Sequence, residues 1–265
     1  MHPHAETLWR GPRWTLAILL AVLGMLGPFS IDTYLPAFSG IASSLNASPV
    51  HMQQTLSAYL FGFAFMNLFH GALADSFGRR PVILWGLMAF TLASLGCALA
   101  QNVTQLIVFR AMQGLSCGAG VVVSRAIVRD IFPPTQAQKV MSQITIFFGL
   151  APAIAPIMGG WLFVSLGWHS IFWLLTAIGL ALWAVNFKML PESLHASQRQ
   201  PFSIPHLMRG YWQLCTDPRF LLLALASGIP FNGMFLYVLS APACLGELLQ
   251  LPPTQFFWLF VPVSS

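Results

Sequence analysis

Seven long apolar runs constrain this chain more than any other feature of its sequence. They lie at about 14–31, 54–73, 82–100, 105–128, 140–162, 168–190 and 220–240. An eighth run begins near residue 254 and reaches the last residue, Ser265. A helix needs about 20 apolar residues to cross the hydrocarbon core of a bilayer. The sequence therefore predicts an all-α integral membrane protein.

The charge content supports this prediction and argues against a soluble protein. Only 7% of the residues are charged and the mean hydropathy is +0.73, whereas a soluble domain carries about 25% charged residues. A net charge of +5 can indicate nucleic-acid binding. The arginines are scattered over loops rather than gathered on one face, so we expect the partner to be the lipid bilayer and not a nucleic acid.

The basic residues also predict an orientation in the membrane. Ten of the twelve lie in one set of alternate loops: Arg10, Arg13, Arg79, Arg80, Arg129, Lys139, Lys188, Arg199, Arg209 and Arg219. The opposite loops, at about 33–53, 101–104, 163–167 and 241–253, contain none. Because basic loops stay in the cytoplasm, the N-terminus is predicted to be cytoplasmic.

The segment 191–218 differs from the rest of the chain because it is polar and rich in proline. It divides the chain into a six-helix transmembrane half at 1–190, a cytoplasmic linker at 191–218 and the start of a second half at 219–265. Residues 219–265 would hold a seventh helix and part of an eighth. Residues 204–214 can form an amphipathic helix on the membrane surface.

The sequence contains no motif that indicates a cofactor site or an enzyme active site. The four cysteines have no CxxC spacing and the seven histidines have no HExxH spacing, so we expect neither a metal site nor a disulfide framework. Cys97 and Cys117 lie inside apolar runs and are predicted to be buried packing residues. No pair of nucleophile and base recurs at membrane depth, so we expect no enzyme and no cofactor.

The stretch GALADSFGRRPVIL, residues 71–84, joins the second and third runs through a short polar turn. Such a short connection places the two helices side by side and antiparallel. Gly78 can take a positive φ without steric penalty. Asp75 precedes it, and Arg79 and Arg80 follow it. The turn is either a charged stop signal between membrane helices or part of a functional motif.

Two ionisable residues are predicted to lie within the membrane. Asp32 ends the first run, and an acid at this depth is a functional candidate that can bind a proton or a cation. The alternative is that Asp32 marks the membrane surface. Arg110 lies near the start of the fourth run, three residues before Gln113 on the same helix face. Arg110 either points into the bundle or extends back to the interface.

The end of the fourth run carries Arg125, Arg129 and Asp130. The two arginines complement a helix C-terminus, whereas Asp130 lies at the unfavourable end of the helix dipole. Arg79 or Arg80 is the predicted partner that would stabilise Asp130.

The fifth run contains two prolines and several small residues, namely Gly149, Pro152, Pro156, Gly159 and Gly160. Prolines within a helix bend or loosen it, and neighbouring helices can satisfy the freed backbone groups in a membrane. The run is therefore a flexing or sealing helix or, alternatively, a kinked packing helix.

These stretches together resemble the major facilitator superfamily, and within it the Bcr/CflA-type drug:proton antiporters. GALADSFGRRPVIL resembles the loop motif between helices two and three, and LIVFRAMQGLSCGAG resembles the fourth-helix motif. GLAPAIAPIMGGWL resembles the fifth-helix antiporter motif, with Ala155-Pro156 where Gly-Pro is commonest. DTYLPAF and SRAIVRDIF resemble the ends of the first and fourth helices. The similarity covers about residues 14–240.

The resemblance implies a twelve-helix fold in two halves that expels small amphipathic drug-like molecules as protons enter. Such a protein lies in the bacterial inner membrane, is driven by the proton gradient without a cofactor, and is monomeric at full length. Asp75, Arg79 and Asp130 would form a charge cluster that stabilises the outward-open state, with Gly78, Arg80 and Arg129 beside them.

The resemblance also assigns roles within the membrane. Arg110 would lie in the cavity wall, with Tyr34 and Gln113, and tune a protonatable group such as Asp32. Pro156, Gly159 and Gly160, in the motif that Gly149 and Pro152 begin, would seal the path where helix five meets the second half. A second half of this kind has six helices, and the chain supplies one of them and part of another. The alternative expectation is therefore a truncated, non-transporting half-transporter or a membrane assembly subunit.

Overall fold

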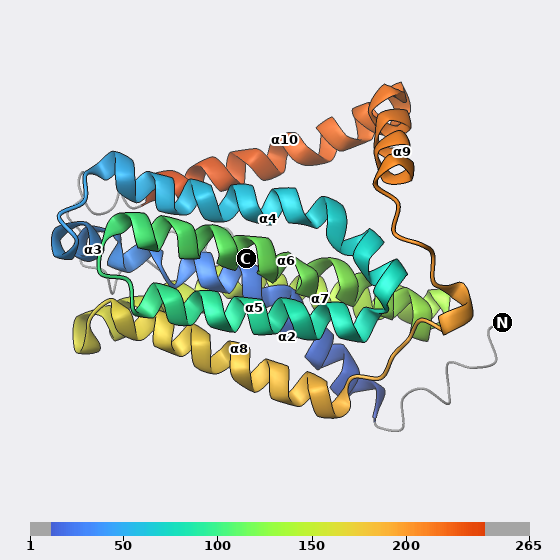
Figure 1. Cartoon of the computed structure of the whole chain (residues 1–265), viewed down its shortest axis with the longest axis horizontal. Helices are drawn as coiled ribbons and strands as arrows, with labels where there is room; N and C mark the ends of the chain where they lie inside the picture. Colours follow the sequence, from blue (N-terminus) through green and yellow to red (C-terminus); the bar gives the residue numbers. More distant parts are fainter. Residues whose placement is uncertain (1–11, 242–265) are drawn as a thin grey trace.

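The computed structural model describes residues 12–241, and helices with short connections make up this part, without a strand. The elements, shown in Figure 1, are α2 (Arg13–Asp32), η1 (Leu35–Ala37), α3 (Phe38–Ser44), α4 (Pro49–Phe77), α5 (Arg79–Ala98), α6 (Val103–Ile131), α7 (Pro134–Leu166), α8 (His169–Met189), η2 (Ala196–Gln198), α9 (Ile204–Thr216) and α10 (Pro218–Ala241).

The predicted apolar runs coincide with these helices. Within the described residues, six helical stretches are long and apolar enough to cross a bilayer, the first of them combining α2, η1 and α3. The seventh predicted run falls on α10, and the eighth, from about 254, lies outside the described residues. The prediction of an all-α membrane protein is confirmed, although several helices extend beyond their apolar runs.

The connections between helices follow from single residues. Asn102 begins α6 by accepting a hydrogen bond from the backbone N–H of Gln105 at 2.9 Å, which satisfies an otherwise free helical donor. Gly78 separates α4 from α5 and has φ 106° and ψ 156°, a conformation that favours glycine. The predicted turn is thus confirmed, and it is a single residue long because α4 continues through Asp75 to Phe77.

Helix α6 lies at the centre of the bundle and packs against α2, α4 and α5, while α5 also packs on α8, and α2 on α7. Small residues allow these close approaches. The Cα of Gly114 lies against the backbone of Tyr59 in α4, and that of Gly120 lies against Leu23 in α2. A Cβ atom at either glycine would overlap these backbones. Packing of this kind holds helices together in lipid, where apolar burial contributes little.

The chain after α8 leaves the bundle and forms a separate surface helix. Figure 1 shows α9 turned across the direction of the bundle helices before the chain enters α10. Ile204, Met208 and Trp212 are exposed along α9, as expected for an amphipathic helix. Tyr211 donates a hydrogen bond to the carbonyl of Leu68 in α4. Partial burial raises the pKa of Tyr211, so the phenol remains protonated as a donor.

Candidate functional site

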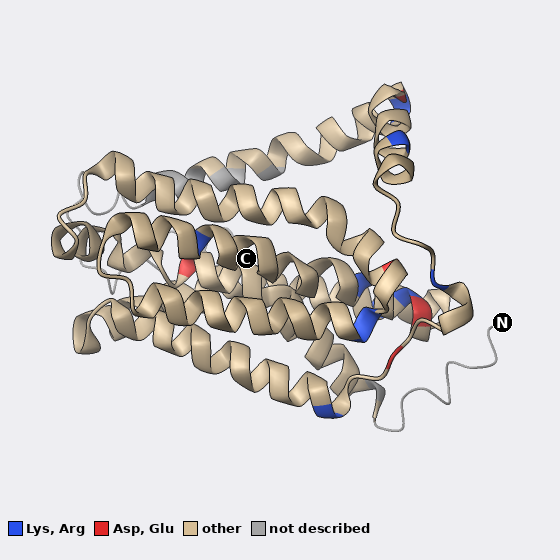
Figure 2. Cartoon of the chain, viewed as in Figure 1, with Lys and Arg blue, Asp and Glu red and all other residues tan. Residues whose placement is uncertain are grey.

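Charged residues are concentrated at one end of the bundle. Figure 2 shows most of the blue and red positions near the α4–α5 turn and on α9, with few along the rest of the helices. Two groups of residues therefore need an explanation. One is the cluster at the turn, and the other is the small set of ionisable residues buried inside the bundle.

Arg79 links two acids at the α4–α5 turn. Its Nη1 lies 2.5 Å from Asp75 Oδ1, and its Nε lies 3.1 Å from Asp130 Oδ2. The Arg79 side chain is only 9% exposed, whereas those of Asp75 and Asp130 are 49% and 24% exposed. The arginine offsets the unfavourable position of Asp130 at the C-terminal end of α6. The predicted pairing of Asp130 with Arg79 is thus observed.

The segment after α8 closes over this cluster, which the sequence did not predict. Ser193 Oγ donates to Asp130 Oδ2 at 2.9 Å. The backbone N–H of Gln200 donates to the carbonyl of Asp75 at 3.1 Å. The linker therefore contacts both acids that Arg79 joins.

Glu192 caps the start of α5. Its carboxylate accepts hydrogen bonds from the backbone N–H groups of Arg79 at 2.9 Å and of Arg80 at 3.3 Å. Free N–H groups at a helix N-terminus bind anions in this way. A Cβ at Gly78 would overlap this carboxylate and crowd the Arg199 side chain. No local spacing could identify Glu192, because 113 residues separate it from Arg79.

The remaining arginines near the turn have different positions. Arg80 Nη2 donates to the carbonyl of Phe187 at 2.6 Å, and its guanidinium lies over the Phe187 ring. Arg129, which was predicted to belong to the charge cluster, is exposed and forms no ion pair with a described residue. The structure therefore corrects its predicted place in the cluster. Arg129 lies one turn of helix after Arg125, which is also exposed, so both side chains face away from the centre of the bundle.

Arg110 is fully buried in the bundle, 0% exposed. Its guanidinium carbon lies 4.6 Å from the ring centre of Tyr34 and 4.3 Å from that of Tyr59. Its Nη1 donates to Gln113 Oε1 at 2.6 Å and more weakly to the Ser30 carbonyl at 3.4 Å. Nε and Nη2 form no hydrogen bond with any residue that the structure describes. The prediction that Arg110 points into the bundle is thus observed.

A hydrogen-bond network fixes the groups around Arg110. Gln113 Nε2 donates to Ser94 Oγ at 2.7 Å. Tyr34 shares a 2.7 Å hydrogen bond with Thr55, and Tyr59 donates to the Gly27 carbonyl at 3.0 Å. The two rings are therefore held on the guanidinium, where cation–π attraction is strongest when water is excluded. The sequence had assigned no role to Ser94.

Asp32 ends α2, as predicted, and is 4% exposed. It forms no ion pair with Arg110 or with any other described residue. The structure thus holds a buried acid and a buried base in the same bundle without pairing them. Buried ionisable groups of this kind are expensive and mark functional sites in membrane proteins.

The proline-rich run forms the continuous helix α7 through both prolines. Pro156 lacks the N–H that would bond the Pro152 carbonyl four residues earlier. Pro152, Pro156, Gly159 and Gly160 are buried, whereas Gly149 is exposed. Gly159 lies against the carbonyl of Thr33 at the end of α2. In the described structure this small-residue face therefore packs within the first six helices, and its sealing role stays a prediction.

In residues 12–241, no three His, Cys, Asp or Glu side chains lie close enough to hold a metal ion. Cys97 and Cys117 are free and buried, in agreement with their prediction as packing residues.

Comparison with known families decides the identity of this fold. A family model described as Major Facilitator Superfamily matches residues 11–264. The chain belongs to the major facilitator superfamily. The predicted family is therefore confirmed.

Individual relatives and structures agree with the superfamily assignment. The chain is 36% identical over 244 residues to a "Bicyclomycin resistance protein homolog" of Haemophilus influenzae, covering 92% of this chain and 61% of that protein. It is 36% identical over 175 residues to "Multidrug resistance protein MdtL" of Escherichia coli, covering 66% and 45%. A crystal structure of a bacterial homolog of the human lysosomal transporter Spinster, 15% identical, matches with a TM-score of 0.73 over 100% of this chain and 60% of its own.

These matches define how far the similarity extends. The chain spans about three fifths of the length of the bicyclomycin resistance homolog and less than half of MdtL. The similarity to a bicyclomycin resistance homolog confirms the predicted resemblance to Bcr/CflA-type members of the superfamily.

Proposed function

We propose that this protein is a proton-coupled multidrug exporter of the bacterial inner membrane that works by alternating access. Its relatives include proteins named for bicyclomycin and multidrug resistance. The observation that carries the proposal is the burial of two ionisable residues, Asp32 and Arg110, neither of which forms an ion pair with a described residue. In this proposal the substrates are small amphipathic molecules, and the N-terminus is cytoplasmic.

The proton-coupling step follows from the chemistry of the two groups. Arginine stays charged under all physiological conditions, so Arg110 is a fixed positive charge inside the bundle. Asp32 is a buried carboxylic acid that can gain and lose a proton. Entry of a proton onto Asp32 would remove its attraction to a cationic or polar substrate. Proton and substrate would then occupy one site in turn.

The charge cluster at the α4–α5 turn is proposed as the latch between conformations. Arg79 joins α5 to α4 through Asp75 and to α6 through Asp130. Glu192 and Ser193 join the linker to the same cluster. Because the linker leads towards α10, the cluster can transmit movement between the six-helix bundle and the chain that follows it.

The test is transport in everted membrane vesicles, with the protein driven by an imposed proton gradient. We expect gradient-dependent uptake of bicyclomycin or a fluorescent cationic dye, abolished by a protonophore. Asp32→Asn and Arg110→Gln should each lower the initial rate by at least about tenfold, because each loses a buried ionisable group that defines the site. Arg125→Gln is the matched control: it removes an exposed arginine from the same helix and should stay within about twofold of wild type.

The outcomes separate the hypotheses. Wild-type rates in both Asp32→Asn and Arg110→Gln, with equal amounts of protein in the membrane, would contradict the proposed roles. Absence of gradient-driven uptake by the wild-type protein, at a normal amount in the membrane, would favour a non-transporting subunit instead.

A further inference from the structure

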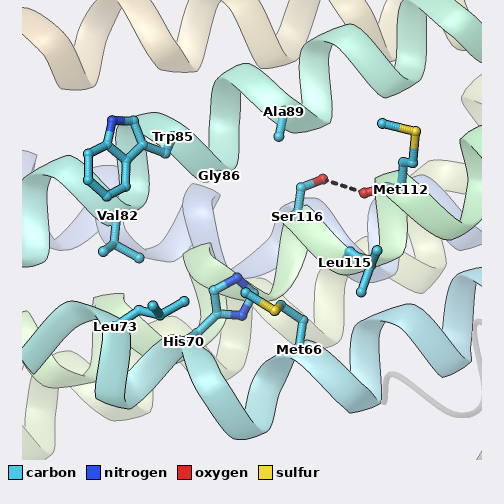
Figure 3. A pocket seen from close by; sticks show the side chains of 10 residues that line it. All are labelled: Met66, His70, Leu73, Val82, Trp85, Gly86, Ala89, Met112, Leu115 and Ser116. Atoms are coloured by element: carbon cyan, nitrogen blue, oxygen red, sulfur yellow. Dashed lines mark hydrogen bonds between the residues drawn. The ribbon is translucent and has the colours of Figure 1, made fainter. Parts of the chain in front are cut away.

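A groove opens on the side of the bundle between α4 and α5. Its floor is α6, and its volume is about 390 Å³. Met66 and His70 of α4 form one wall, Val82 and Trp85 of α5 form the other, and Ser116 lies on the floor (Figure 3). The volume is that of a small-molecule pocket, for which about 300–1,000 Å³ is usual.

Close contacts with α6 create the groove. Helix α4 approaches α6 where Gly62 lies against the Ala111 carbonyl, and α5 approaches α6 where Gly86 lies against Ala119. Helices α4 and α5 make few contacts with each other beyond their shared turn. Both helices therefore lean on α6 and leave a space between them at membrane depth. The exposed side chain of Trp85 lies at its edge.

His70 is the feature that distinguishes this groove from an ordinary gap filled by lipid chains. The residue is 3% exposed, and its buried Nδ1 has no hydrogen bond to a described residue. Figure 3 shows the imidazole between the two walls. No hydrogen bond joins it to Ser116, whose Oγ donates to the carbonyls of Met112 at 3.0 Å and Gln113 at 2.9 Å in its own helix. A buried polar group without a hydrogen bond is unfavourable unless a ligand supplies the missing partner.

The groove is distinct from the Arg110 centre. Met112, which lines the groove, follows Arg110 by two residues on α6, so the two side chains point to nearly opposite sides of the helix. Arg110 is buried, whereas Met112 is 48% exposed. A ligand in the groove would therefore not contact the residues proposed to couple protons.

We infer that this groove binds a small, uncharged, phenol-like amphiphile drawn from the bilayer, with its hydroxyl group on His70. A neutral imidazole offers one acceptor nitrogen and one donor nitrogen, which match a phenol O–H. Met66, Met112 and Trp85 would contact the ring, since methionine sulfur packs favourably on aromatic edges. None of the lining residues is an acid, a lysine or an arginine, so a charged ligand would find no counter-charge.

The test uses a photoreactive alkylphenol that carries a diazirine, with the protein in lipid nanodiscs and cross-links located by mass spectrometry. We expect labelling at Met66, Trp85 and Met112. His70→Leu should weaken labelling about tenfold, as expected for a lost buried hydrogen bond. It should not change labelling by the matching alkylbenzene probe, which lacks the hydroxyl.

Two tryptophan substitutions on α5 provide a matched pair. Ala89→Trp fills the groove from an exposed lining position and should abolish labelling at the three residues. Leu92→Trp changes an exposed residue outside the lining and should leave labelling unchanged. Thermal unfolding of each variant confirms that it is folded.

Three results would overturn the inference. Equal labelling of wild type and Ala89→Trp would show that the probe does not enter the groove. Equal labelling of the wild-type protein by the phenol and the alkylbenzene probes would show that the groove holds an acyl chain and that His70 has no role in binding. No labelling of the groove in the folded wild-type protein would show that another segment or molecule covers it.

Discussion

Arg110 is a buried cation that forms no ion pair with a carboxylate of residues 12–241, and the shape of its guanidinium explains how it is accommodated. The planar group lies between the rings of Tyr34 and Tyr59 while Nη1 reaches Gln113. Lysine keeps the charge but cannot stack in this way. We therefore expect Arg110→Lys to lose most transport, by about tenfold or more, although it conserves charge. Initial rates in everted vesicles measure this, and wild-type rates for Arg110→Lys would show that charge alone is sufficient.

At the level of elements, Glu192 joins the linker to the first turn of α5. Glu192→Gln removes the anion that the Arg79 and Arg80 N–H groups bind. We expect faster amide hydrogen exchange at the start of α5 and in residues 190–200. Loss of this charged cap should lower the free energy of unfolding by about 1 kcal/mol.

A second acid in the same region is the control for this element. Asp217→Asn alters an exposed acid that accepts from the Arg219 N–H at the start of α10. Its effect on exchange should stay near α10. Unchanged exchange in residues 190–200 for Glu192→Gln would mean that other contacts, such as the one between Gln200 and Asp75, hold the linker in place.

The sequence could predict elements more completely than contacts. Apolar length located the membrane helices, and Gly78 located the turn, because both signals are local. The pairing of Asp130 with Arg79 was also predictable, since an acid at a helix C-terminus needs a cation nearby. Glu192 was not, because its partners are 113 residues away. The exposure of Arg129 and the packing of Gly159 against α2 depend on helix rotation, which apolar runs of this kind do not determine.

At the scale of the whole molecule, the charge distribution of the bundle makes its orientation testable. Gln101 precedes α6 at the end of the bundle opposite the α4–α5 turn, and Gln200 lies in the linker at the charged end. Both are exposed. Basic residues favour the cytoplasmic side, so Gln200 should be cytoplasmic and Gln101 should face the other side. In a variant without the four native cysteines, a membrane-impermeant maleimide should label Gln101→Cys in intact cells and Gln200→Cys only in everted vesicles. The opposite pattern would invert the topology and place the proposed latch on the outer surface.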